Sequence, residues 1–343
     1  MRFVAIDQVI PGLRLAKTLY GAKGEILLRE NFELTEGNLF RLIELGFTGL
    51  YIEDEISEGI LIEDVVEEQV RLVAAARLEM IINKNGNIAD MQPMISEIVD
   101  SIIANSDVVI NMNKLRGHHE YTYLHCVNVG ILAVSIGVKL KFKRERLIHL
   151  GTAGMLHDIG KKYIPEEILD KKGKLTDEEY KIIQQHPETG YKMLTDTREL
   201  SSISKVGVLQ HHERYDGSGY PKGLKGCKIT IFGRIIAVVD TYDAMTSDRA
   251  YRIAYSPAET MEYLMGAGNQ LYDLQVIEKF TRCIAVYPVG TCAELSDGTK
   301  VIILQNYPDC VLRPLVRNIE NKVIIDLKND VNYLNICISK AIK

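Results

Sequence analysis

The segment His211–Gly226 reads HHERYDGSGYPKGLKG and is the most informative stretch of this 343-residue chain. It begins with two adjacent histidines and continues into a glycine-rich loop that contains Tyr220 and Pro221. Because neighbouring helical residues diverge by about 100°, His211 and His212 would face two different ions rather than share one. The pair therefore indicates a site for more than one metal ion.

Outside this segment, further histidines and aspartates stand in surroundings that suit metal ligation. They are His125, His157, Asp158, His186 and Asp240. Imidazole and carboxylate ligands together suit Fe, Mn or Zn. Two divalent ions roughly 3.5 to 4 Å apart can clamp a phosphate and ionise a water between them. The chain thus offers ligands for a multinuclear hydrolytic centre.

These residues stand in motifs that resemble those of the HD-GYP domains, over about residues 117–280. The motifs follow the family's order and read LHDIGK, IPEEIL, KLTDEEY, HPETGY, HHERYDGSGYPKGLKG and RIIAVVDTYDAMTSDRAYR. The resemblance implies a helical bundle of the HD superfamily. It also implies a metal-dependent phosphodiesterase that hydrolyses cyclic di-GMP to pGpG, with onward cleavage to GMP left open.

Matching the motif positions implies a set of metal ligands that binds two divalent ions. The set is His125, His157, Asp158, His186, His211, His212 and Asp240. In this resemblance Asp158 bridges the two ions, and a hydroxide between them attacks phosphorus. Tyr121 stands where members with three metals have a glutamate, so two ions are expected rather than three. Iron or manganese is the expected metal.

The resemblance also indicates residues that act on the substrate. Lys161 is placed to neutralise a phosphoryl oxygen as charge builds in the transition state. Arg249 and Arg252 match the family's substrate-phosphate positions, where guanidinium groups suit bidentate contacts. The Gly219–Pro221 segment is expected at the substrate, with Tyr220 either stacking on a guanine or ordering the loop. Asp158 and Lys161 are thus the expected catalytic residues.

One departure from the family pattern concerns the segment Tyr272-Asp273-Leu274, where the family usually has Phe-Asp-Pro. The change removes no predicted metal ligand. It bears on the shape of the substrate groove, and therefore on which base is read more than on hydrolysis itself.

Three alternatives stay open beside the cyclic di-GMP phosphodiesterase. The first is hydrolysis of a related cyclic dinucleotide such as cyclic GMP-AMP, because no single residue declares the base. The second is a catalytically quiet adaptor that binds cyclic di-GMP; the complete ligand set argues against it. The third is an HD-superfamily hydrolase of another phosphoester, which the His211–Gly226 segment disfavours.

The pattern along the chain predicts a mainly α protein with small β-containing parts at both ends. The expected parts are a small α+β module over 1–58, a helical connector over 59–116, the catalytic domain over 117–283 and a β-rich extension over 284–343. In the connector, apolar residues at helical spacing predict one buried helix face, with a dimer seam as the alternative. This face comprises Ile62, Val66, Val70, Val73 and Ile81.

Composition narrows the location and the partners. A net charge of −5 gives no general attraction to nucleic acid polymers. The six cysteines form no C-x-x-C pair, and no signal-peptide pattern opens the chain, so a cytoplasmic location is expected. The longest apolar run, Val127–Leu140, is interrupted by Asn128 and Lys139, and no membrane span is predicted. A homodimer and protein partners in signalling stay open.

Overall fold

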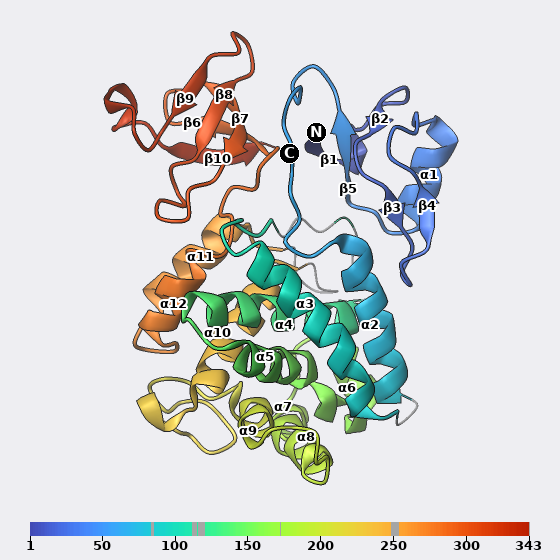
Figure 1. Cartoon of the computed structure of the whole chain (residues 1–343), viewed down its shortest axis with the longest axis vertical. Coiled ribbons are helices and arrows are strands. Elements are labelled where there is room, and N and C mark those ends of the chain that lie inside the picture. Colours follow the sequence, from blue (N-terminus) through green and yellow to red (C-terminus); the bar gives the residue numbers. More distant parts are fainter. Residues whose placement is uncertain (84–85, 112–114, 116–120, 172, 248–253, 343) are drawn as a thin grey trace. The chain divides into compact units, whose positions relative to one another are not determined.

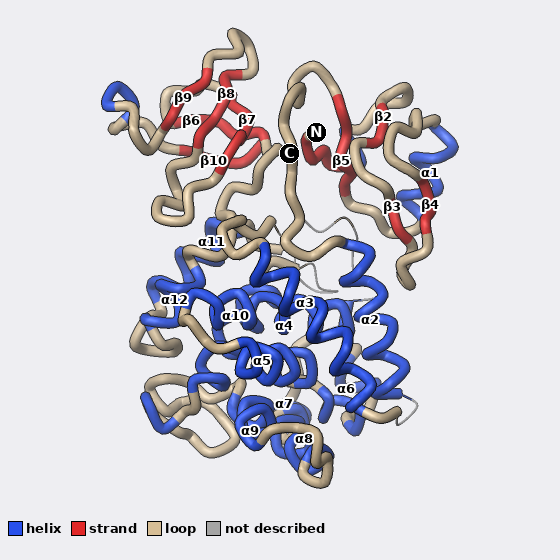
Figure 2. The backbone as a smooth tube through the Cα atoms, viewed as in Figure 1, coloured by secondary structure: helices blue, strands red, loops and turns tan. Residues whose placement is uncertain are grey.

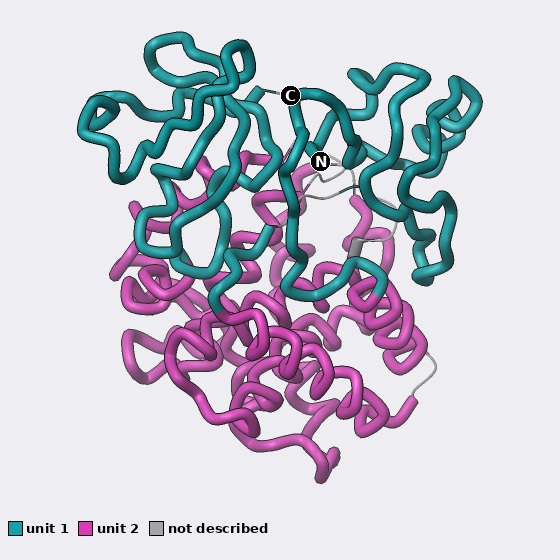
Figure 3. Tube along the Cα trace, turned by 45° about the horizontal axis from the view of Figure 1, so that its top comes forward, with its two compact units in different colours: residues 1–69, 107–119, 281–343 teal, residues 70–106, 120–280 magenta. Residues whose placement is uncertain are grey.

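The computed structural model describes residues 1–83, 86–111, 115, 121–171, 173–247 and 254–342 (Figure 1). The chain forms two compact units, coloured separately in Figure 3. A β-rich unit contains residues 1–69, 107–119 and 281–343, and a helical unit contains residues 70–106 and 120–280. All the strands described belong to the β-rich unit, at the two ends of the chain (Figure 2).

The N-terminal part of the β-rich unit is a small α+β arrangement. Its elements are β1 (Arg2–Ala5), β2 (Arg14–Leu15), β3 (Leu19–Tyr20), β4 (Ile26–Leu28), α1 (Glu36–Glu44) and β5 (Gly49–Glu53). β1, β5 and β2 form an antiparallel sheet in that order, and β3 pairs with β4. Thr35 begins α1 with a capping box, because its side chain accepts from the Asn38 amide while Asn38 accepts from the Thr35 amide.

The C-terminal part is an antiparallel five-stranded sheet in the order β10-β6-β7-β8-β9. Its strands are β6 (Cys292–Leu295), β7 (Lys300–Gln305), β8 (Leu315–Asn318), β9 (Ile324–Asp326) and β10 (Ile338–Ile342). The turn between β6 and β7 contains Asp297, whose carboxylate accepts from the Thr299 amide, and Gly298, at a φ of 86°. The Asp-Gly pair therefore forms the turn that its sequence predicts.

The two ends of the chain share one hydrophobic core. Buried Leu50 and Ile52 of β5 belong to the same cluster as Cys292 and Ile302 of the C-terminal sheet. The Arg317 guanidinium adds a polar link, because it donates to the carbonyl oxygens of Ile56 and Glu58. The β-rich unit is thus assembled from residues about 250 positions apart.

The helical unit holds the remaining helices. They are α2 (Glu68–Asn83), α3 (Gln92–Ala104), α4 (Tyr121–Lys139), α5 (Arg144–Leu156), α6 (Glu166–Leu169), α7 (Asp177–Ile183), α8 (His186–Leu194), α9 (Ser202–Gln210), α10 (Ile231–Met245), α11 (Pro257–Gly266) and α12 (Leu274–Phe280). Short 3-10 turns, η2 (Ile88–Met91), η4 (Ile159–Tyr163) and η5 (Gly226–Lys228), join some of them. Another two lie in the β-rich unit, η1 (Ile6–Gln8) and η6 (Val331–Tyr333).

Close packing of α4 on α5 brings ligand-bearing segments together. A Cβ on Gly154 would lie 2.8 Å from the Gly130 Cα, so only glycine permits this approach. The segment Thr122–Lys139 of α4 has a mean hydropathy of 1.3 and the length of a membrane span, but 72% of it is buried inside the protein. These are the properties of a core helix.

The predicted apolar face before and along α2 is wrong in its phase. The helix begins at Glu68, so Ile62 and Val66 are buried but precede it. Within the helix, Val73 is 36% exposed. The buried face is formed instead by Leu72, Ala74, Ala75, Leu78 and Ile82. A single helical register drawn from Ile62 onward selects the wrong side, because the chain is not helical over its first turns.

Candidate metal centre

Five segments of the helical unit supply the predicted ligands. His125 lies in α4, and Asp240 lies in α10. His157 and Asp158 follow the end of α5, and His186 is the first residue of α8. His211 and His212 follow the end of α9. The structure brings all of these predicted ligands into one cluster, although they span 115 positions of the sequence.

Asp158 lies at the middle of the cluster, with each carboxylate oxygen turned to a different group of imidazoles. Its Oδ2 is 3.3 Å from His157 Nε2 and 3.9 Å from His125 Nε2. Its Oδ1 is 3.3 Å from His186 Nε2 and 3.9 Å from His211 Nε2. Asp158 is therefore common to two candidate ligand groups.

Asp240 and His212 complete the two groups. Asp240 Oδ1 is 3.2 Å from His125 Nε2 and 3.7 Å from His157 Nε2. His212 belongs to the group of Asp158, His186 and His211, whose ligand atoms all lie within 4.8 Å of one another. Each side of the cluster therefore combines imidazole with carboxylate, a donor set that divalent transition metals accept.

Local hydrogen bonds orient three of the imidazoles. The Nδ1 atoms of His157, His186 and His211 lie 2.6–2.8 Å from the carbonyl oxygens of Gly154, Ile183 and Val208, each three residues earlier. A carbonyl oxygen only accepts, so Nδ1 carries the proton and Nε2 carries a lone pair. The fold thus fixes the tautomer that leaves Nε2 free to bind a metal.

Several nitrogen and oxygen atoms of the cluster face one another without a hydrogen bond between them. His186 Nε2 and His211 Nε2 lie 3.1 Å apart, and two lone pairs cannot form a hydrogen bond. His157 Nε2 and Asp158 Oδ1 are buried and have no hydrogen-bond partner among the residues that the structure describes. Buried polar atoms without partners cost free energy unless something binds them. The donors that face one another here fit divalent cations.

Asp243 is a residue of this centre that the sequence interpretation missed. Its Oδ2 lies 2.7 Å from His125 Nδ1, and its Oδ1 accepts from Asn128. Asp243 is fully buried, three residues beyond Asp240 on α10. A carboxylate on the second ring nitrogen orients a ligating histidine and increases its basicity. The Asp-x-x-Asp spacing in RIIAVVDTYDAM is the signal that could have revealed it.

Burial and neighbouring charges shift the pKa values of the clustered histidines in opposite directions. Burial lowers the pKa of His186 to about 4, and it holds the pKa of His211 and of His212 well below the ordinary range. Burial also lowers the pKa of His125, but hydrogen bonds with Asp240 and Asp243 outweigh it and raise this pKa to about 9. Three of the candidate ligands are therefore neutral at neutral pH, the form in which imidazole binds metal.

Lys161 lies beside the cluster on η4. Its ammonium donates to Asp158 Oδ2 at 2.6 Å, and its side chain is 32% exposed. Burial opposes its charge, but the Asp158 carboxylate outweighs burial and raises the pKa of Lys161. The residue before it, Gly160, packs against α8, since a Cβ there would lie 2.0 Å from the His186 carbonyl oxygen. This contact brings the Lys161 ammonium close to the candidate ligands Asp158 and His186.

A model of the HD domain family matches residues 97–276, which span the whole cluster. The chain belongs to the HD domain family. The predicted mainly α fold is confirmed, and the HD-GYP resemblance with it. A solved HDG"Y"P protein from Bdellovibrio bacteriovorus has this fold, with a TM-score of 0.55 at 17% identity over 81% of this chain and 97% of that one.

Curated relatives of this HD domain protein are named as phosphodiesterases of cyclic dinucleotides. A cyclic di-GMP phosphodiesterase of Pseudomonas aeruginosa is 37% identical over 229 residues, which are 67% of this chain and 55% of the relative. A 3'3'-cGAMP-specific phosphodiesterase of Vibrio cholerae is 37% identical over 165 residues, 46% of this chain and 37% of the relative. The chain spans about half or less of the length of these relatives.

In this HD domain, hydrogen bonds to Glu213 and a ring contact with His212 stabilise the loop after His212. The buried carboxylate of Glu213 accepts from the amides of Lys222 and Leu224, each at 2.8 Å. The Tyr220 ring stacks on the His212 ring, with centroids 4.8 Å apart. The predicted Gly219–Pro221 segment therefore lies next to a candidate ligand. Arg249 and Arg252, the other predicted substrate contacts, lie outside the described residues.

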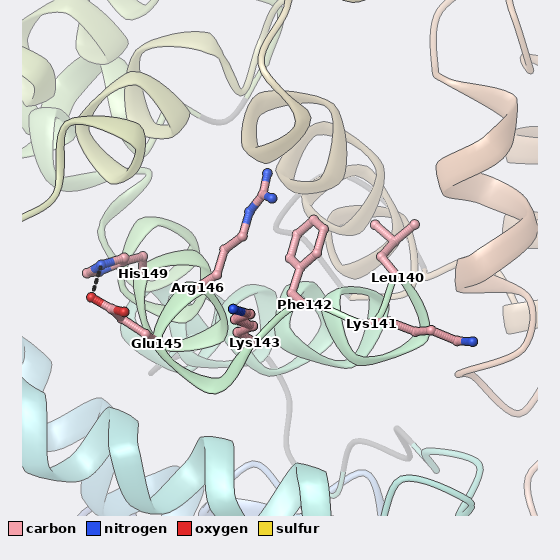
Figure 4. Close-up of a pocket in the computed structure, with 7 residues that line it drawn as sticks. All are labelled: Leu140, Lys141, Phe142, Lys143, Glu145, Arg146 and His149. Carbon is pink, nitrogen blue, oxygen red and sulfur yellow. Dashed lines mark ion pairs between the residues drawn. The ribbon is translucent and has the colours of Figure 1, made fainter.

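A surface pocket of the HD domain holds none of these residues. It has a volume of about 490 Å³ and lies at the α4–α5 turn, lined by Leu140–Lys143, Glu145, Arg146 and His149 (Figure 4). Arg146 extends beside Phe142, with its guanidinium carbon 4.1 Å from the ring centroid. No candidate metal ligand is among the residues that line this pocket.

Proposed function

We propose that this protein is a metal-dependent phosphodiesterase that hydrolyses cyclic di-GMP to pGpG, with onward cleavage to GMP left open. The observation that carries the proposal is the buried cluster in which the two oxygens of Asp158 face two groups of imidazole Nε2 atoms. Two divalent ions, iron or manganese, are the proposed occupants, with His125, His157 and Asp240 on one side and His186, His211 and His212 on the other. Divalent ions supply hydroxide from water at neutral pH and neutralise phosphodiester charge.

The side chains of the protein have separate proposed tasks. Asp158 contacts both groups of candidate ligands and fixes their positions relative to each other. Lys161, whose ammonium stays charged beside Asp158, offsets the charge that builds on a phosphoryl oxygen in the transition state. Tyr220, stacked on His212, is a proposed substrate contact beside the cluster. Arg249 and Arg252 are proposed phosphate contacts on their motif positions alone.

The six cysteines are all free thiols, and the structure pairs none of them. Free thiols suit a reducing compartment. We therefore place the proposed reaction in the cytoplasm.

The test is anaerobic incubation of the iron- or manganese-loaded protein with cyclic di-GMP, with products separated by chromatography. Asp158→Ala should abolish formation of pGpG and GMP and lower the metal content. Asp170→Ala, an exposed carboxylate in the same unit, is the matched control and should retain both. Intact substrate despite two bound metals per chain would refute the proposal for this messenger.

Cyclic GMP-AMP is the second candidate substrate, because one relative of comparable identity is named for that specificity. Parallel assays at equal concentrations of the two dinucleotides compare their kcat/KM values directly. A larger kcat/KM for cyclic GMP-AMP would replace cyclic di-GMP in the proposal. Tight binding of cyclic di-GMP with no turnover of either dinucleotide would favour the adaptor.

A further inference from the structure

The Arg214 guanidinium has an unusual environment for a charged group. Its carbon lies 4.8 Å from the centre of the Tyr272 ring, in a cation–π contact. Its Nη1 atom is buried and has no hydrogen-bond partner among the described residues. Leaving a buried donor of a charged group unpaired is costly. The arrangement suggests that a ligand atom completes it.

The carboxylates around Arg214 are engaged elsewhere. Asp273, next to Tyr272, pairs with Arg234. Glu213 accepts from two loop amides, and Asp216 accepts from the amide and hydroxyl of Ser218. No acidic side chain of the described protein pairs with Arg214. Within the described part of the chain, its charge is therefore available to an anionic ligand.

Tyr272 links the Arg214 guanidinium to a segment of the candidate metal centre, because it contacts both Arg214 and Thr241. Its ring is 3% exposed, and its hydroxyl lies 2.9 Å from the Thr241 Oγ1. The Thr241 hydroxyl donates to the Ala237 carbonyl, so the Tyr272 hydroxyl is the donor in this second bond. Thr241 directly follows the candidate ligand Asp240, and Arg214 follows the candidate ligand His212 by two residues. The guanidinium is therefore anchored to two ligand-bearing segments.

We propose that Arg214 binds an anionic oxygen of the substrate phosphodiester that is not being cleaved, and that Tyr272 is the residue that positions it. This inference rests on the proposed function. A cyclic dinucleotide has two phosphodiesters, and the metal cluster receives the scissile one. The second carries a negative charge that a guanidinium can neutralise. A guanidinium with an unused buried donor matches it.

The experiment compares two substrates that differ in this second phosphate. Cyclic di-GMP has two phosphodiesters, and bis(p-nitrophenyl) phosphate has one. For Arg214→Ala, KM for cyclic di-GMP should rise at least tenfold with little change in kcat. The loss in kcat/KM for bis(p-nitrophenyl) phosphate should be at least fivefold smaller. Arg214→Lys, which keeps the charge, should recover part of the affinity.

Variants of Tyr272 test the positioning role. Tyr272→Leu removes the ring beneath Arg214 and should raise KM for cyclic di-GMP as Arg214→Ala does. Tyr272→Phe keeps the ring and loses only the bond to Thr241, so its effect should be smaller. Unchanged melting temperatures for Arg214→Lys and Tyr272→Phe keep these comparisons free of unfolding.

Equal losses on both substrates would show a structural role and overturn the proposal, as would an unchanged KM for cyclic di-GMP. If the unmodified protein hydrolyses bis(p-nitrophenyl) phosphate but not cyclic di-GMP, the proposed function fails by itself. Equilibrium binding of cyclic di-GMP to the metal-loaded protein then decides the inference. Weaker binding by Arg214→Ala would support it, and equal binding would overturn it.

Discussion

The Nδ1 atom of His125 lies 2.7 Å from Oδ2 of Asp243, so a fully buried carboxylate orients one candidate ligand. Asp243→Asn removes this charge and keeps the shape. We expect a 10- to 100-fold loss of metal affinity or activity, of about the size found when such supporting groups are changed. Metal content by elemental analysis and kcat on cyclic di-GMP measure it. Asp170→Asn is the control, and a fully metallated, fully active Asp243→Asn would contradict the assigned role.

Lys161 should affect the rate more than metal binding. Lys161→Met removes the ammonium 2.6 Å from Asp158 Oδ2. We expect kcat to fall by about 10²- to 10³-fold, the usual cost of losing a group that stabilises transition-state charge. Metal content should stay near two per chain. The neighbouring Lys162, which donates to the Ile82 carbonyl, provides the control Lys162→Met, for which kcat should change less than threefold. Similar kcat values for the two variants would argue against a catalytic Lys161.

Gly160 should tolerate no side chain. The Cβ of Gly160→Ala would lie 2.0 Å from the His186 carbonyl oxygen, so η4 and α8 must separate. We expect a loss of a few kcal/mol in the free energy of unfolding, about the cost of overpacking a tight core, together with weaker metal binding. Gly266→Ala is the matched control, since a Cβ there meets nothing within 4 Å. Denaturant unfolding of both variants tests the difference, and equal stability would contradict it.

The metal-free protein should lose stability in mild acid. Burial lowers the pKa of His186 from its ordinary 6.5 to about 4, so between these values the unfolded chain binds more protons than the native one. Stability therefore falls as pH drops from 6.5 towards 4, by on the order of 3 kcal/mol for this histidine alone. His125, with its pKa raised to about 9, acts oppositely and loses its contribution as pH rises from 6.5 to 9.

Melting temperatures of chelator-treated protein at pH 7.0, 5.5 and 4.5 measure this effect. His186→Gln, which cannot be protonated, should show a shallower decline over the same range. A melting temperature independent of pH below 6.5 would contradict the buried neutral histidine.

The sequence predicts the bounds of some helices. The helical patterns of the sequence predict helices over 144–156 and 257–266, and α5 (Arg144–Leu156) and α11 (Pro257–Gly266) have these bounds. Ser256 and Pro257 mark the start of α11 as cap and first residue. β1 and β10 were not predicted, because four or five residues of mixed character become strands only beside their partners β5 and β6.

The candidate site could also be predicted only in part. The candidate ligands stand in motifs with distinctive neighbours, so the sequence alone proposes the residues that the structure brings together. The supporting contacts could not, because they join distant positions. Asp243 reaches His125 across 118 residues, and Tyr272 reaches Thr241 across 31. The direction in which a carboxylate points follows from how α4 packs on α10, which motif spacing does not determine.

The shared core of the β-rich unit has a consequence for synthesis on the ribosome. Leu50 and Ile52 pack in one cluster with Cys292 and Ile302, so the first strands wait for the last part of the chain to emerge. The helical unit is complete at residue 280 and can fold before then. Chains that end at residue 280 and have been released from the ribosome should therefore contain a protease-resistant helical unit and a protease-sensitive N-terminal segment.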